Sequence, residues 1–192
     1  MRIIATVVLA GALSSTTAAG QEFKPSSNPV SDAVRRALAR DSKNLIGAAE
    51  LMPADKYSYK PTPAQMSFGQ LIVHIVQTNV FLCSAIAGAP PAVDRYPTFT
   101  PPLLKKMSET EPKDTLVGAI KQSFEYCTEA LAKATDSQLA EQAMMFGQPA
   151  PLSRADTMVV IAADWADHYS TAASYLRLNN ILPPSAQPKP TK

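Results

Sequence analysis

The chain has 192 residues, of which 46% are hydrophobic and 18% charged, and its formal net charge at pH 7 is +2. This length is close to that of a single domain and is enough to build a substantial core. The nearly balanced charge, without a dense basic stripe or interleaved aromatic residues, disfavours nucleic-acid binding.

Residues 1–20 have the pattern of a secretory signal peptide. A basic start at Arg2 precedes an apolar run over residues 3–13, and small residues lead to a predicted cut after Ala19 or Gly20. The run is well short of the roughly 20 residues that span a bilayer. We therefore expect a periplasmic or secreted protein with no membrane span in its mature form.

The first part of the mature chain predicts two long helices. Residues 21–29 form a polar leader. A first helix is predicted over residues 31–52, because its apolar residues recur on one stripe and Ser31 is a good N-cap. A second helix is predicted over residues 67–87 and ends at Gly88.

A long connection follows the second helix. Residues 88–113 contain six prolines, which are too many for a regular element. We interpret this segment as a crossover that spans the length of the domain, so that the helices before and after it can run parallel.

Two further helices complete the domain. One begins near Asp114 and carries apolar residues at helical spacing as far as Leu131. Residues 141–152 predict a loop with some extended backbone, and the last helix runs from Ser153 or Arg154 to Asn179.

The arrangement of these segments predicts one domain. Residues 183–192 form a polar tail that we expect to be disordered. Four long amphipathic helices without a strongly alternating segment predict an all-α four-helix bundle over residues 30–182.

The two histidines of the chain, His74 and His168, both lie in the middle of a predicted helix. At about 100° of rotation per residue, each falls on the apolar face of its helix. Asp164 precedes His168 by four residues, so the two side chains share a face one turn apart. Asp167 is turned further toward the polar side and is the weaker candidate.

Two interpretations of these polar residues remain open from the residues alone. A His and an Asp at i and i+4, with a His from a facing helix, can hold a divalent cation and leave positions for water or substrate. Alternatively, Asp164 forms a hydrogen bond with His168, while His74 finds its own hydrogen-bond partner in the core. Residue types alone favour this structural interpretation.

Other residues attract interest for different reasons. Cys83 and Cys127 can become a disulfide in an oxidising compartment. We expect Asp41 to lie at a helix edge exposed to water. Three aromatic residues can either line a pocket or pack in the core, namely Tyr57, Tyr59 and Trp165. The second helix also has valines on its other side, which indicate either additional core or the face of a homodimer, namely Val73, Val76 and Val80.

Two stretches of the sequence carry a recognisable pattern. The first reads Met52-Pro-x-x-x-Tyr57-x-Tyr59-x-Pro61, then Ser67-Phe-Gly-Gln-Leu-x-x-His74-Ile. The second reads Asp164-x-x-x-His168, then Leu176-Arg177 and Ile181-x-Pro183-Pro184. In this order and spacing they resemble the DinB-like (DinB/YfiT) family of four-helix bundles over residues 30–186. The family usually has His-x-x-x-His where this chain has Asp164 and His168.

The resemblance implies a bundle of up-down-down-up topology with a metal site between its second and fourth long helices. Carried over to this chain, the metal ligands are His74, Asp164 and His168. A set of two histidines and one carboxylate suits a divalent cation such as Zn, Fe, Mn or Ni. Some members of the family are thiol-dependent transferases or isomerases, and many have no assigned reaction.

We therefore expect an exported protein whose divalent metal meets a small-molecule substrate. A metal-dependent hydrolase and a thiol-dependent transferase are the activities that this site favours. The alternative is a non-catalytic binding or stress-related bundle with a degenerate metal site, so the sequence leaves open whether the chain is an enzyme.

Overall fold

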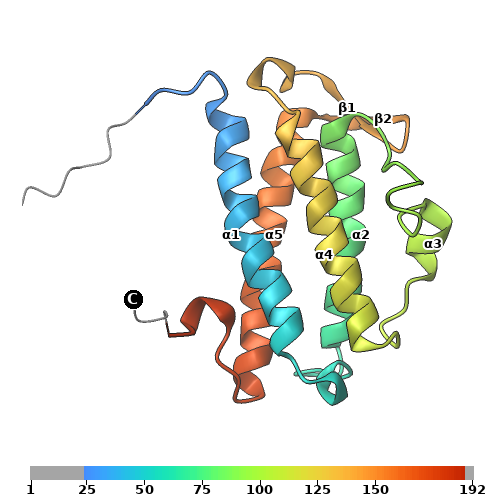
Figure 1. Ribbon diagram of the computed structural model, residues 1–192, viewed down its shortest axis with the longest axis vertical. Helices are drawn as coiled ribbons and strands as arrows, with labels where there is room; N and C mark the ends of the chain where they lie inside the picture. Colours follow the sequence, from blue (N-terminus) through green and yellow to red (C-terminus); the bar gives the residue numbers. More distant parts are fainter. Residues whose placement is uncertain (1–23, 189–192) are drawn as a thin grey trace, which may run out of the picture.

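The structure is a computed structural model and describes residues 24–188 (Figure 1). The predicted signal peptide, residues 1–20, lies outside the described residues, as do residues 189–192. Within the described part, the long helices are α1 (Pro29–Leu51), α2 (Phe68–Ala87), α4 (Lys113–Ala132) and α5 (Arg154–Leu178). Shorter elements are η1 (Ala54–Lys56), α3 (Pro101–Lys106), η2 (Asp136–Gln138), β1 (Gln142–Met145), β2 (Gln148–Ser153) and η3 (Pro184–Ala186).

The long helices form an up-down-down-up bundle. Helices α1 and α2 each pack against both α4 and α5. In Figure 1, α1 and α5 run downward while α2 and α4 run upward, and the connection that carries α3 passes along the side of the bundle. The predicted all-α fold and its topology are confirmed.

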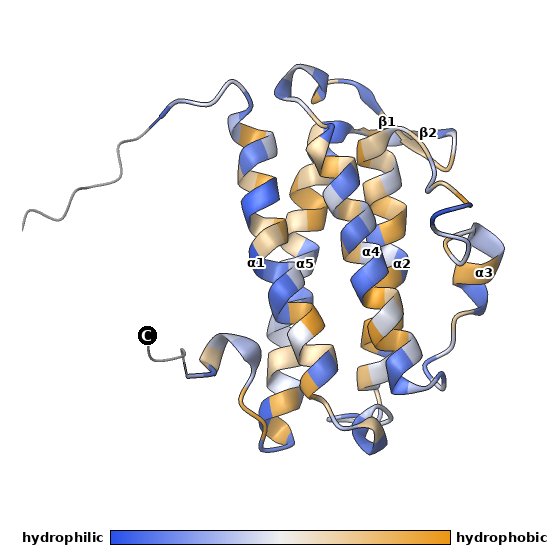
Figure 2. Ribbon diagram, in the orientation of Figure 1, coloured by the Kyte–Doolittle hydropathy of each residue, from blue (hydrophilic) through white to orange (hydrophobic). Residues whose placement is uncertain are grey.

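The core lies between the four long helices. Each of them contributes a fully buried aliphatic residue, namely Leu45, Ile72, Ile120 and Ile161. Hydrophilic residues mark the outer faces of α1 and α4 in Figure 2. Helix α2 is apolar enough by length and composition to cross a membrane, with a mean hydropathy of 1.5, but 67% of the relevant window is buried inside the bundle.

The burial of α2 on two sides also answers the question about its extra valines. Val76 and Val80 are fully buried and Val73 is nearly so. These side chains belong to the core because α2 packs against both α4 and α5. They therefore cannot form an exposed dimer face.

The ends of α2 and α5 agree closely with the sequence prediction. The Ser67 hydroxyl accepts a hydrogen bond from the backbone N–H of Gln70, whose side chain accepts one from the backbone of Ser67. Ser153 and Asp156 form the same reciprocal cap at the start of α5. Gly88 adopts a φ of 72°, the left-handed conformation that ends α2.

The start of α1 differs from the prediction. The N-cap is Asn28 rather than Ser31, because Pro29 occupies the first turn, where no backbone donor is needed. The backbone N–H groups of Val30 and Ser31 donate instead to the carboxylate of Asp136, at 2.9 and 2.8 Å. A distant side chain thus replaces the predicted local cap.

The two segments predicted to be irregular contain short elements. Pro101 and Pro102 begin α3 instead of preventing it, since both stand in the first turn of that helix. Strands β1 and β2 form an antiparallel hairpin, which confirms the predicted extended backbone. Phe146 and Gly147 form its turn with φ values of 48° and 81°.

The first residues of the predicted disordered tail have a defined structure. Pro184 packs against Gly47 of α1, where an added Cβ would lie 3.0 Å from the proline Cγ. The Tyr169 hydroxyl donates to Ser185 Oγ at 2.6 Å. The tail up to residue 188 therefore follows the surface of the bundle, contrary to the expectation from composition.

Candidate metal centre

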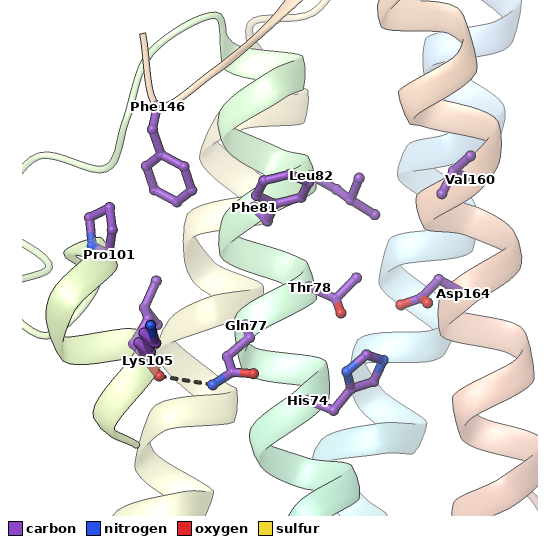
Figure 3. A pocket seen from close by; sticks show the side chains of 11 residues that line it. His74, Gln77, Thr78, Phe81, Leu82, Pro101, Lys105, Phe146, Val160 and Asp164 are labelled. Carbon is purple, nitrogen blue, oxygen red and sulfur yellow. Dashed lines mark hydrogen bonds between the residues drawn. The ribbon is translucent and has the colours of Figure 1, made fainter. Parts of the chain in front are cut away.

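Three polar side chains converge between α2 and α5. His74 comes from α2, and Asp164 and His168 come from consecutive turns of α5. One ligand atom from each residue lies within 4.8 Å of the other two. The imidazole rings of His74 and His168 have centroids 4.8 Å apart. Figure 3 shows His74 and Asp164 facing each other across the gap between their helices.

The local sequence explains this convergence. The spacing of four residues on α5 places Asp164 and His168 on the same face of the helix. The burial of Trp165 directs this part of α5 toward the bundle interior. The packing of α2 against α5 then brings His74 opposite this pair.

The purely structural interpretation does not account for the geometry. His168 Nε2 lies 3.7 Å from Asp164 Oδ1, which is too far for a hydrogen bond. Within residues 24–188, both His168 Nε2 and Asp164 Oδ2 are buried atoms without a hydrogen-bond partner. Because unpaired buried polar atoms are costly, we expect an ordered water or a bound ion to satisfy these two atoms. A divalent cation between these donors fits this expectation.

Burial shapes the charge of the site. Burial lowers the pKa of His74, the neighbouring His168 lowers it further, and Asp164 opposes the change. These effects together favour the neutral form of His74, which has a lone pair to donate. Burial also raises the pKa of Asp164, while the two histidines act in the opposite direction.

Asp167 is not part of this cluster. Its side chain is 80% exposed, compared with 21% for Asp164 and 12% for His168. Its carboxylate lies 3.7 Å from His168 Nδ1, on the solvent side of the imidazole. The structure thus separates the two aspartates as the helical spacing predicts.

A cavity of about 840 Å³ opens onto His74 and Asp164 (Figure 3). Its remaining walls come from α2, α3, α5 and the hairpin turn, and they include Lys105 and Phe146. The sequence analysis did not identify these last two residues, because they lie in segments that were interpreted as connections. The signals available were the positive charge of Lys105 and Gly147, a residue common in turns, with the aromatic Phe146 directly before it.

The other candidates serve the packing of the bundle. Trp165 is fully buried, and Tyr57 is buried with its hydroxyl donating to the carbonyl of Ala49. Tyr59 packs edge-on against Tyr175. Asp41 is only 2% exposed, so its predicted place at a water-exposed edge is wrong.

Asp41 can be buried because the neighbouring Arg40 forms an ion pair with its carboxylate. Arg40 donates to both carboxylate oxygens at 2.8 Å while its own side chain remains 64% exposed. Such a bidentate pair satisfies an inward carboxylate without placing the cation in the core.

The two cysteines, whose redox state the sequence left open, form a disulfide. Cys83 of α2 and Cys127 of α4 are joined, with their Cα atoms 5.2 Å apart. Both residues are fully buried. The disulfide therefore crosslinks two core helices and is separate from the cluster of His74, Asp164 and His168.

Comparisons with known proteins point to one family. The sequence profile of the DinB superfamily matches residues 37–172. Among solved structures, a DinB-like protein from Bacillus subtilis superposes with a TM-score of 0.59 at 20% identity, covering 82% of this chain and 99% of that one. A DinB-like protein from Bacillus cereus gives 0.60 at 14% identity, covering 80% and 95%. No curated protein matches the sequence.

Proposed function

The chain belongs to the DinB superfamily, and from this premise we propose that His74, Asp164 and His168 bind a divalent cation that meets a small-molecule substrate. The observation that carries the proposal is the pair of buried, unpartnered atoms, His168 Nε2 and Asp164 Oδ2, in a cluster of three potential ligands. The set of two imidazoles and one carboxylate suits Zn, Fe, Mn or Ni.

Each residue has a distinct part in this proposal. His74 donates a neutral imidazole from α2, while His168 donates a second imidazole from α5. Asp164 stands where the family usually has a histidine, and its carboxylate supplies a negative charge that a neutral imidazole lacks. Three protein ligands leave coordination positions open, and the cavity at His74 and Asp164 provides access to them.

The proposed chemistry is metal-assisted hydrolysis or transfer to a thiol. A bound divalent cation supplies Lewis acidity, which lowers the pKa of a coordinated water or thiol. The walls of the cavity orient the substrate and exclude part of the bulk water, while the rigid helices hold the three ligands in place. A binding function without catalysis is the alternative outcome.

We also propose that the protein is exported. The pattern of residues 1–20 supports this proposal, as does the buried disulfide between Cys83 and Cys127. Such disulfides persist mainly in oxidising compartments such as the periplasm.

Metal content provides the test of the cation site. Protein purified without an affinity tag is stripped of metal with a chelator and exposed separately to Zn, Mn, Fe(II) and Ni. Its metal content is then measured by inductively coupled plasma mass spectrometry. We expect one equivalent of metal in the wild type. The substitutions His74→Ala and Asp164→Ala are expected to weaken binding by more than the roughly 10- to 100-fold that follows loss of an outer-shell partner.

Asp167→Asn is the matched control. It removes a carboxylate from the same stretch of α5, but that carboxylate is exposed, so metal content is expected to remain at one equivalent. Circular dichroism of each variant establishes that the bundle is folded. Failure of the wild type to retain any of the four metals, or equal retention in the His74 and Asp164 variants, would contradict the proposal.

A further inference from the structure

The cavity beside the candidate metal centre has an apolar side and a polar side. In Figure 3, Phe81 and Phe146 lie together on one side of it, while Lys105 and His74 lie on the other. A ligand that matches both sides has an apolar body and a charged or polar group at its edge. The individual side chains indicate which kind of body and which charge.

Two aromatic rings form the apolar side. Phe81 of α2 and Phe146 of the hairpin turn have ring centroids 6.0 Å apart and planes inclined by 45°. Phe81 is 42% exposed, although it is a large apolar residue in the middle of a core helix. Partly exposed aromatic side chains that line a cavity are typical of ligand-binding sites and favour flat apolar groups.

The backbone of Phe146 makes this aromatic wall unusual. Its φ of 48° lies in the left-handed region, at the first position of a two-residue turn that strongly favours Asn, Asp or Gly. A bulky residue in this conformation costs free energy, and such costs concentrate at functional sites. The chain keeps an aromatic ring at the cavity in a position where a small polar residue would suit the turn better.

Lys105 provides the charge on the polar side. It lies in the last turn of α3, which is fixed to α2 because the Gln77 side chain donates to the carbonyl of Leu104 at 2.8 Å. Within the described part of the chain, Lys105 forms no ion pair closer than 4.0 Å, unlike Arg95 and Lys121. Its ammonium group is therefore free to pair with an anionic ligand.

We propose that this cavity binds a small carboxylic acid with an aromatic or similarly flat apolar body. The carboxylate lies at Lys105, the body rests against Phe81 and Phe146, and the far end reaches toward His74 and Asp164. As a substrate class, this inference rests on the proposed function. The contacts that bind the acid, however, belong to residues outside the metal ligands.

The first test compares three probes that differ in one feature each. 4-Phenylbutyrate carries a ring and a carboxylate, 4-phenylbutan-1-ol lacks the charge, and butyrate lacks the ring. Isothermal titration of metal-free and metal-reloaded wild type is expected to show binding of 4-phenylbutyrate in both forms. We expect the other two probes to bind at least about fivefold more weakly.

The second test uses matched variants. Lys105→Gln is expected to weaken binding of 4-phenylbutyrate about fivefold, whereas Lys106→Gln, the neighbouring lysine outside the cavity lining, is expected to leave it unchanged. Phe146→Asn removes the ring but suits the positive φ, so we expect about fivefold weaker binding with an intact or more stable fold.

The outcomes separate this inference from the proposed metal site. Equal binding of the acid and the alcohol, or full affinity in both Lys105→Gln and Phe146→Asn, would overturn the inference. Protein that retains no metal but binds 4-phenylbutyrate with the expected variant pattern supports the inference and contradicts the metal site. Protein that retains metal but binds none of the probes overturns the inference alone.

Discussion

Three polar side chains inside the bundle satisfy one another across three helices. The Trp165 Nε1–H donates to Asn79 Oδ1 at 2.7 Å, and Asn79 Nδ2 donates to Ser123 Oγ at 3.0 Å. All three residues are fully buried. Because Trp165 follows Asp164 directly, this network fixes the rotation of α5 and thereby the direction of the carboxylate at the candidate metal centre.

Asn79→Leu tests the contribution of this network. The substitution leaves the Trp165 Nε1–H buried without an acceptor, so we expect the free energy of unfolding to fall by about 1–3 kcal/mol. Urea denaturation followed by circular dichroism measures the change. Asn44→Leu is the control, since Asn44 is partly exposed and its side chain forms no hydrogen bond within residues 24–188. Equal stability of the Asn79 variant and wild type would refute this account.

At the scale of elements, the start of α1 depends on a residue of η2. Burial raises the pKa of Asp136, but the hydrogen bonds that its carboxylate accepts from Ser31 and Val30 together bring that pKa below its usual value. A carboxylate at a helix N-terminus also interacts favourably with the helix dipole. The charged form of Asp136 therefore joins η2 to α1.

This arrangement predicts a pH-dependent stability. Because the pKa of Asp136 is lower in the folded protein than in the unfolded chain, its contribution is complete above the unfolded value of about 3.9 and is lost as pH falls through the folded pKa. Asp136→Asn is expected to destabilise the protein at pH 7 and to reduce the loss of stability between pH 5 and pH 3. Thermal melts at these pH values provide the measurement, and parallel curves for variant and wild type would exclude this role.

The disulfide affects the unfolding of the entire chain, because it keeps α2 and α4 joined. Cys83 and Cys127 close a loop of 44 residues that contains the crossover and α3. Closing such a loop restricts the unfolded chain, and the chain-entropy relation gives a stabilisation of about 4 kcal/mol. Lys105 lies within this loop, so the disulfide joins the two helices between which the segment lining one side of the cavity runs.

The proposed export predicts that the protein is processed and oxidised. Its intact mass, measured on protein recovered from the periplasm or medium, should correspond to a chain without residues 1–20 and with both cysteines joined. The double substitution Cys83→Ala and Cys127→Ala is expected to lower the free energy of unfolding by about 4 kcal/mol. Retention of residues 1–20, or free thiols in the wild type, would contradict this prediction.

Features that depend on a few consecutive residues could be predicted from the amino-acid sequence. The helix starts at Ser67 and Ser153 and the stop at Gly88 arise within one helical turn, and the structure confirms all three positions. Helical periodicity likewise placed His74 on the inward face of α2, and Asp164 with His168 on that of α5. These features follow from the backbone geometry that every helix shares.

Features that depend on distant partners could not be predicted in this way and became visible only in the folded bundle. Asp136 caps α1 across 106 residues, and packing on two sides buries the valines of α2. The cavity joins Lys105 and Phe146, which come from separate connections. Such contacts depend on which helix faces compete for burial in the assembled bundle, and no local pattern encodes that competition. The sequence therefore determined the inward faces of the helices, while the packed bundle decided which residues meet there.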